Sequence, residues 1–211
     1  MAYAAHNPSV GYCQSMNFLA ATILLQLKEE EPSFWVLVVL VEDILKQYYH
    51  RSLLGLRVDQ AVLDEYVKIY LPKVHTHFVR NNFELCFAST SWLLCVFINS
   101  LSWACVHHVI DLLLYDGSSI IIRSSLGLLG LLEPRILATR GQEELLKMMK
   151  PKGGFMTLDS NGTEIDGLKL MQSTFLKFPQ LKDLERRRDT HRNSQRLRMQ
   201  EPAPFLKSPP A

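Results

Sequence analysis

Apolar runs separated by short polar breaks dominate the sequence and limit the folds that it can adopt. Residues 34–41 and 120–132 are almost continuously apolar, and residues 58–70 place apolar side chains on one side of a helix. Two-residue alternation and hairpin turn signals, which would indicate strands, are lacking. Ile120-Ile121-Ile122 alone would also suit a strand. The pattern as a whole predicts an all-α fold.

Changes in composition divide the chain into three parts. Residues 1–150 hold the apolar runs and are expected to form a multi-helix domain. A linker signal, Lys150-Pro151-Lys152-Gly153-Gly154, opens a second part over residues 151–199, which is expected to be a linker and a basic helical segment. Residues 200–211 contain four prolines and are expected to be a disordered tail. The expected helices of the first part cover residues 16–27, 34–49, 58–70, 103–115, 120–132 and 143–149, with another that Ser89 or Thr90 could cap.

One charge-free stretch, residues 87–106, is long enough to cross a bilayer. Serine, threonine and asparagine are scattered through it, and His107, His108 and Asp111 follow at once. We therefore expect two short buried helices, broken near residues 99–102, and no transmembrane span.

Charge and metal-ligand spacing exclude several classes of function. The formal net charge of +2 gives no argument for nucleic-acid binding. Residues 182–198 hold seven Lys or Arg against three Asp or Glu, which indicates a solvated helix or a frayed tail, with weak contact to an anionic membrane as the minority interpretation.

The four cysteines form no disulfide framework, so a reducing, cytoplasmic location is expected. No metal site is expected, since the histidines and cysteines miss zinc spacing and residues 159–167 miss that of a calcium loop.

The segment from Asn7 to Asn17 reads as a loop running into a helix, because Pro8 and Gly11 break regular structure just before an apolar stretch. The helix that follows would carry on one face Met16, Ala20, Ile23, Leu24 and Leu27. Gln14 would point roughly 135° away from that face. An amide at this junction can bind or position a partner, or it can simply be solvated or cap a backbone group.

This segment resembles the glutamine-bearing motif of the TBC domain, the module that activates Rab-type small GTPases. The matching positions are Asn7, Pro8, Val10, Gly11, Tyr12, Cys13, Gln14, Met16 and Asn17. Ser15 departs, since the family usually has glycine there. The resemblance covers residues 3–132 through further blocks that include Leu54, Gly55, Leu56, Asp59, Gln60, Leu63, Trp92, Phe97, Leu101, Asp111, Gly117 and Ser118. The last block departs at Ser102, Ile110 and Asp116.

The resemblance also implies an arginine that this sequence does not supply. TBC domains carry an I-x-x-D-x-x-R block upstream of the glutamine motif, whereas the first arginine here is Arg51. The chain thus resembles a TBC domain that lacks its first helices. We expect apolar surface around Phe18, Leu19 and Leu25 to be exposed as a consequence.

The resemblance implies a GTPase-activating protein that regulates vesicle traffic, a regulator and not itself an enzyme. Gln14 would be the glutamine finger, with Tyr12 and Cys13 as support, and Gly11, Tyr12 and Asn17 would contact the GTPase. No cofactor is expected, because GTP and Mg²⁺ are carried by the partner. Without the arginine, activity is expected to be impaired, and the location would be cytoplasmic or peripheral on endomembranes. The alternative is a helical module that binds a GTPase or another partner without catalysis.

Overall fold

The computed structural model describes residues 2–150 and 165–200, and this part of the chain is helical without strands. The elements in order are α1 (Ala2–His6), α2 (Met16–Leu27), α3 (Glu30–Val39), the π-helical turn η1 (Leu40–Ile44), α4 (Leu54–Tyr70), α5 (Pro72–Arg80), α6 (Cys86–Leu94), α7 (Trp103–Asp116), α8 (Ser119–Ala138), α9 (Gly141–Met149), α10 (Gly167–Gln172), the π-helical turn η2 (Ser173–Lys177) and α11 (Leu184–Gln200). The all-α prediction is therefore confirmed.

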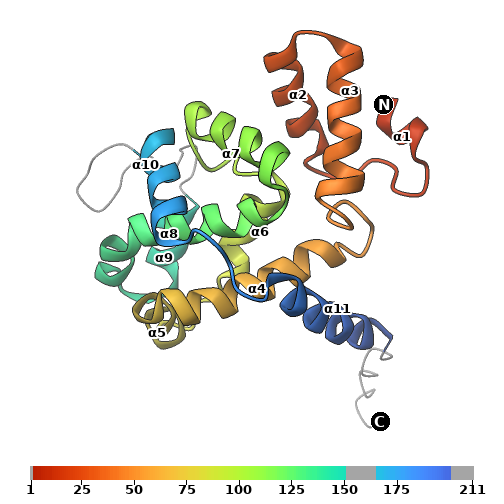
Figure 1. Ribbon diagram of the computed structural model, residues 1–211. Helices are drawn as coiled ribbons and strands as arrows, with labels where there is room; N and C mark the ends of the chain where they lie inside the picture. The colour runs from red at the N-terminus through yellow and green to blue at the C-terminus, as the bar shows by residue number, and fades with distance from the viewer. Residues whose placement is uncertain (1, 151–164, 201–211) are drawn as a thin grey trace, which may run out of the picture.

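Helix α8 is the centre of the helical body (Figure 1). It is buried on nearly all sides and packs against α4, α5, α6, α7, α10 and η2. The absence of a side chain at Gly127 lets η2 approach closely, since a Cβ there would lie 2.6 Å from Thr174 Oγ1. The nearly continuous apolar run in the sequence thus corresponds to a helix that must be covered all round.

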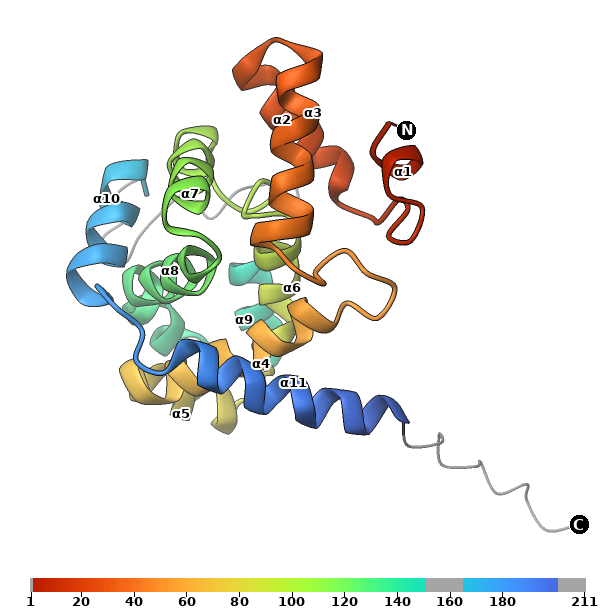
Figure 2. The same cartoon turned by 45° about the vertical axis from the view of Figure 1, so that its right-hand side comes forward.

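The hairpin of α2 and α3 projects from this body, with α1 lying beside α3 (Figures 1 and 2). Its inner side is apolar and includes Met16, Leu19 and Ile23 of α2, which are all buried. The hairpin holds the glutamine motif at its base, where the loop after α1 enters α2.

The apolar face predicted for the helix that begins at Met16, now α2, is partly wrong. Leu24 and Leu27 are exposed, while Leu19, which was expected at the surface, is 0% exposed. Phe18 and Leu25 are exposed as expected, Leu25 at 65%. Leu24 lines the hollow between α1, α2 and α3 and so stays partly open to solvent, whereas Leu19 belongs to the buried core.

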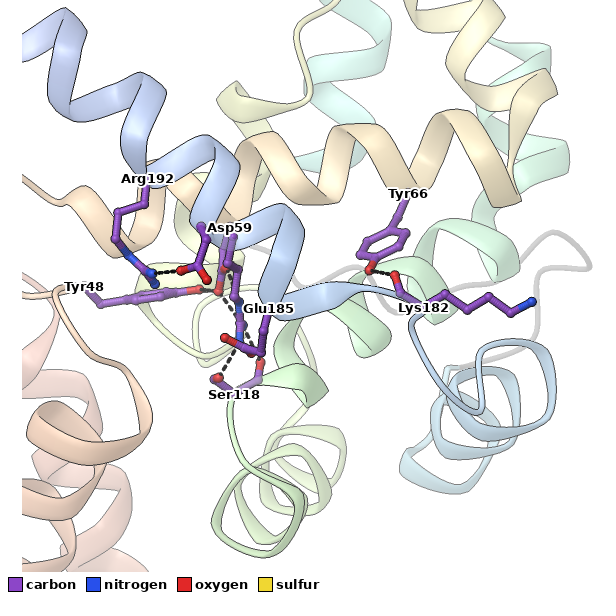
Figure 3. A network of polar contacts seen from close by, with 9 residues as sticks. Tyr48, Asp59, Tyr66, Ser118, Lys182, Glu185 and Arg192 are labelled. Atoms are coloured by element: carbon purple, nitrogen blue, oxygen red, sulfur yellow. Dashed lines mark hydrogen bonds and ion pairs between the residues drawn. The ribbon is translucent and has the colours of Figure 1, made fainter.

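Helix α11 lies along α4, far from it in sequence (Figure 2). Arg188 of α11 is 7% exposed and reaches Asp59 of α4 through Nε to Oδ1 at 2.8 Å and Nη2 to Oδ2 at 2.9 Å. Figure 3 shows Asp59 together with Tyr48, Ser118 and Glu185, which surround this pair. The Arg188 guanidinium also donates to Ser118 and Glu185, and the Tyr48 hydroxyl donates to Asp59. Residues 182–198 therefore have a packed face as well as a solvated one.

Asp59 and Ser118, which belong to two separate blocks of the TBC resemblance, both contact Arg188. Burial alone would lower the pKa of Arg188, but the Asp59 carboxylate raises it above its usual value. The guanidinium therefore stays charged and holds three distant segments together.

Residues 87–106 contain two elements, α6 and the start of α7, separated by turns at 95–101, so the expected break is confirmed. No helix among the described residues is long and apolar enough to span a membrane. α6 begins at Cys86, earlier than the expected caps Ser89 and Thr90, and the helix expected over residues 34–49 is α3 followed by η1, which ends at Ile44. α1, α5, α10 and η2 were not expected. The linker signal after Lys150, most of the calcium-like stretch 159–167 and the Pro-rich tail 201–211 lie outside the described residues.

Candidate functional site

Gln14 lies in a tight turn that leads into α2. The Met16 amide donates to the Cys13 carbonyl at 3.2 Å, so Gln14 and Ser15 occupy the two central positions. Ser15 has φ 86° and ψ −19°, which match the third position of a type II turn. That position favours glycine, since a side chain at positive φ is strained. The turn explains why glycine suits this position of the motif, and why the serine at position 15 introduces backbone strain.

The same turn is fixed to the body of the domain through Ser15. This residue is buried, and its hydroxyl accepts a hydrogen bond from the Cys95 thiol at 3.1 Å. Cys95 follows α6, and the nearby Tyr49 hydroxyl donates to the Leu94 carbonyl at 2.8 Å. The contact ties the turn to a segment eighty residues away.

Asn7 fixes the other end of the motif loop. Its side-chain oxygen accepts from the Val10 amide at 3.3 Å, and its Nδ2 donates to Glu42 Oε1 at 2.8 Å. The Tyr3 hydroxyl donates to the same oxygen at 3.0 Å. These two hydrogen bonds lower the pKa of Glu42, while burial and the Glu42 contact raise the pKa of Tyr3 to about 12. Glu42 thus stays ionised and holds the loop against η1.

The Gln14 side chain takes no part in these anchors. It is exposed, and its amide has no hydrogen-bond partner among residues 2–150 and 165–200. Cys13 is half-buried, and burial raises the pKa of its thiol, so it suits packing and not nucleophilic chemistry. An exposed amide on a rigid turn can contact a second molecule without first giving up an internal bond.

Three residues expected to contact a GTPase lie on one groove. Gly11, Tyr12 and Asn17 line a hollow of about 310 Å³ between α1, α2 and α3, together with Met16 and Phe34. Tyr12 is 66% exposed, and its hydroxyl lies 3.4 Å from Asn17 Oδ1. Gln14 is not among the lining residues, so the groove and the glutamine are adjacent features of one motif. We refer to this hollow as the motif groove.

Within the described part of the chain, no group of three or more His, Cys, Asp or Glu side chains is placed to hold a metal ion.

The Rab-GTPase-TBC domain family matches residues 1–137, which include the turn, the motif groove and all but the last residue of α8. The chain belongs to this family. TBC1 domain family member 2B of Xenopus tropicalis is 34% identical over 205 residues, covering 95% of this chain and 21% of the relative. Growth hormone-regulated TBC protein 1 of Rattus norvegicus is 38% identical over 159 residues, covering 74% of this chain and 55% of the relative.

A solved structure shows the same fold. The crystal structure of the Chlamydomonas flagellar RabGAP TBC domain superposes with a TM-score of 0.70 at 32% identity, covering 82% of this chain and 56% of that one. The chain thus spans between a fifth and about half of the proteins that it matches. Because the match to member 2B of the TBC1 domain family covers nearly the whole chain, the similarity extends past residue 137.

Sequence reasoning located the motif and its family, but it treated residues 182–198 as one basic unit. The structure separates Arg187 and Arg188, which pair with Glu65 and Asp59, from Arg192 and Arg196, which line a cleft beside the motif loop. The sequence did contain one indication of this: Arg192 and Arg196 are four residues apart, about one helical turn, which places both on the same face of a helix.

Proposed function

We propose that this domain binds a Rab-type small GTPase and places Gln14 at the site of GTP hydrolysis. The observation that carries the proposal is the exposed Gln14 amide, which is unpartnered among the described residues and held on a turn anchored through Ser15 and Asn7. Membership of the Rab-GTPase-TBC domain family supports a Rab-type partner. The domain would act in trans on the catalytic site of the GTPase, whose own GTP and Mg²⁺ supply the chemistry.

The proposed role of Gln14 follows from the requirements of phosphoryl transfer to water. The attacking water must be oriented, and the negative charge that develops on the phosphoryl oxygens must be neutralised. The Gln14 amide can both donate and accept a hydrogen bond, so it suits the first task. A neutral amide cannot perform the second, for which an arginine finger is worth about 10³–10⁵ in rate, or roughly 4–7 kcal/mol.

We therefore propose that this polypeptide by itself is an impaired activator. Arg51, the first arginine in the sequence, does not lie in an I-x-x-D-x-x-R block. Arg192 and Arg196 share a cleft with Asn7 and Val10, but that cleft is not lined by Gln14. The motif groove, through Gly11, Tyr12 and Asn17, would supply binding contacts that do not depend on the arginine. Such a protein would work in the cytoplasm, at the surface of endomembranes that carry Rab proteins.

Binding and hydrolysis should be measured separately across a panel of Rab GTPases loaded with GTP. We expect one or more of them to bind, with a residual acceleration of at most about 10²-fold in single-turnover assays. Gln14→Ala should remove that acceleration and change the binding constant less than about twofold. Gln142→Ala, which removes an exposed glutamine on α9, is the matched control and should change neither.

The outcomes separate the parts of the proposal. Absence of binding to every Rab of the panel would contradict the function itself. Full acceleration by the wild-type chain would contradict the impairment. Residual acceleration that survives Gln14→Ala would contradict the role of the glutamine and favour a binding module without catalysis.

A further inference from the structure

A second cleft, of about 570 Å³, lies between the motif loop, the segment that follows α3, and α11. Lys46 and His50 line one part of it, and Arg192 and Arg196 of α11 line another. Each pair is spaced by four residues, and on helix α11 this puts both guanidinium groups on one face. We refer to this hollow as the basic cleft.

In the described part of the chain, two cations of the basic cleft, Lys46 and Arg196, are free to bind a ligand. Among residues 2–150 and 165–200, the side chains of Lys46 and Arg196 have neither an ion-pair nor a hydrogen-bond partner. Arg192 pairs with Asp189 of its own helix, at the surface, where such a pair adds little stability. Arg187 and Arg188, by contrast, are already engaged by α4. Of the cations that line the cleft, Lys46 and Arg196 are thus unpaired among the described residues, and Arg192 is held only by a surface pair.

One carboxylate, Glu42, lines the same cleft. Its Oε1 already accepts from Tyr3 and Asn7, so that oxygen is committed to holding the motif loop. Lys46, Arg192 and Arg196 outnumber it three to one, before any contribution from His50. A cleft with this excess of positive charge attracts anions, and it attracts a compact anion with several charges more strongly than a single carboxylate.

We propose that the basic cleft binds a ligand that carries two or more phosphate groups. Guanidinium groups form paired hydrogen bonds with phosphate oxygens, and an ammonium group adds a point charge. A hollow that receives cations from two separate elements selects a compact polyanion over an extended strand of nucleic acid. Soluble polyphosphates and the headgroups of phosphorylated inositol lipids share this chemistry. The inference does not depend on the proposed action on a Rab protein.

The test uses the full chain, inositol trisphosphate and isothermal titration calorimetry at about 0.15 M salt. We expect saturable binding that Arg196→Gln weakens about tenfold or more, since each charged hydrogen-bonding group contributes strongly. Arg198→Gln removes the same charge from an exposed residue of α11 that does not line the cleft, and it should weaken binding less than about twofold. Lys46→Gln combined with Arg196→Gln should abolish binding. Unchanged thermal unfolding of each variant verifies the fold.

Vesicles then distinguish the two sources of the ligand. Vesicles with phosphatidylinositol bisphosphate are compared with phosphatidylserine vesicles of equal surface charge. Preference for the bisphosphate, lost in Arg196→Gln and kept in Arg198→Gln, supports the cleft and identifies a lipid headgroup as its ligand. Binding of soluble inositol trisphosphate without vesicle binding supports the cleft with a soluble ligand. Absence of inositol trisphosphate binding, or equal losses in Arg196→Gln and Arg198→Gln, would overturn the proposal.

Discussion

The guanidinium of Arg188 and the carboxylate of Asp59 form a two-pronged ion pair, although 129 positions separate them in the chain. Both side chains are buried, and Tyr48 and Ser118 complete the hydrogen bonding. A buried ion pair adds little stability compared with an apolar contact of similar size. Removing one partner is nevertheless strongly destabilising, because the other charge is then buried without a partner. The pair therefore fixes how α11 lies on α4.

Replacing Arg188 should show this asymmetry. Arg188→Met leaves the Asp59 charge buried and unpaired, so we expect the free energy of unfolding to fall by about 3–5 kcal/mol in urea denaturation. Arg186→Met is the matched control on the same helix, because the Arg186–Asp183 pair is largely exposed and should contribute less than about 0.5 kcal/mol. Equal losses in the two variants would contradict the buried pair.

The turn below Gln14 should become more stable when Ser15 is replaced by glycine. Glycine adopts the φ of 86° without strain, and the thiol–hydroxyl contact that is lost is weak. We expect Ser15→Gly to raise the free energy of unfolding by about 0.5–1 kcal/mol, measured by urea denaturation. Ser15→Ala keeps the strain and loses the contact, so it should be destabilising. A loss of stability in Ser15→Gly would show that the Cys95 contact outweighs the strain.

Two glycines of α8 should respond to alanine with opposite signs. A Cβ at Gly127 would meet Thr174 Oγ1 at 2.6 Å, so Gly127→Ala should destabilise by about 1–3 kcal/mol through overpacking. At Gly130 the nearest atoms lie 3.8–3.9 Å from such a Cβ, and Gly130→Ala should stabilise the helix by about 0.5–1 kcal/mol. Thermal unfolding of both variants measures the two changes in stability. Equal shifts would indicate that η2 does not pack tightly on α8.

The Glu42 carboxylate should make the stability depend on acid pH. Hydrogen bonds from Asn7 and Tyr3 lower its pKa in the folded state. The stabilisation is therefore present above the unfolded pKa, near 4.3, and is lost as the pH falls through the lower folded pKa. Glu42→Gln should flatten the fall of the urea midpoint between about pH 5 and pH 3. Asn7→Ala, which removes one donor, should flatten it partly, and an unaltered pH profile in Glu42→Gln would refute the assignment.

Much of the helical framework could be predicted from local patterns. The apolar run at residues 120–132 indicated α8, and the polar residues at 99–102 indicated the break between α6 and α7. The helix that begins at Met16 and the loop before it were also predicted, which placed Gln14 at a loop–helix junction. These features depend on residues close in the chain, whose breaks and periodicity are visible in the sequence.

The faces of the helices and the role of α11 could not be predicted in this way. Leu24 and Leu27 fit the expected apolar stripe of the first helix, yet both are exposed, and Leu19, which lies off that stripe, is buried in the core. Seven basic residues in 182–198 look alike in sequence, yet Arg188 is buried against Asp59 while Arg196 faces the basic cleft. The role of Gln14 in hydrolysis stays a prediction.

The sequence by itself determined that this chain is helical, where most of its helices break, and which segment resembles a TBC motif. Only the tertiary structure decided that Gln14 is exposed on a strained turn, that Ser15 anchors this turn while Asn7 anchors the start of its loop, and which arginines of α11 pair with α4. Local propensity acts over a few residues, whereas burial and charge pairing depend on which distant segment arrives to cover each face. Which segment covers which face is set by the packing of the whole chain.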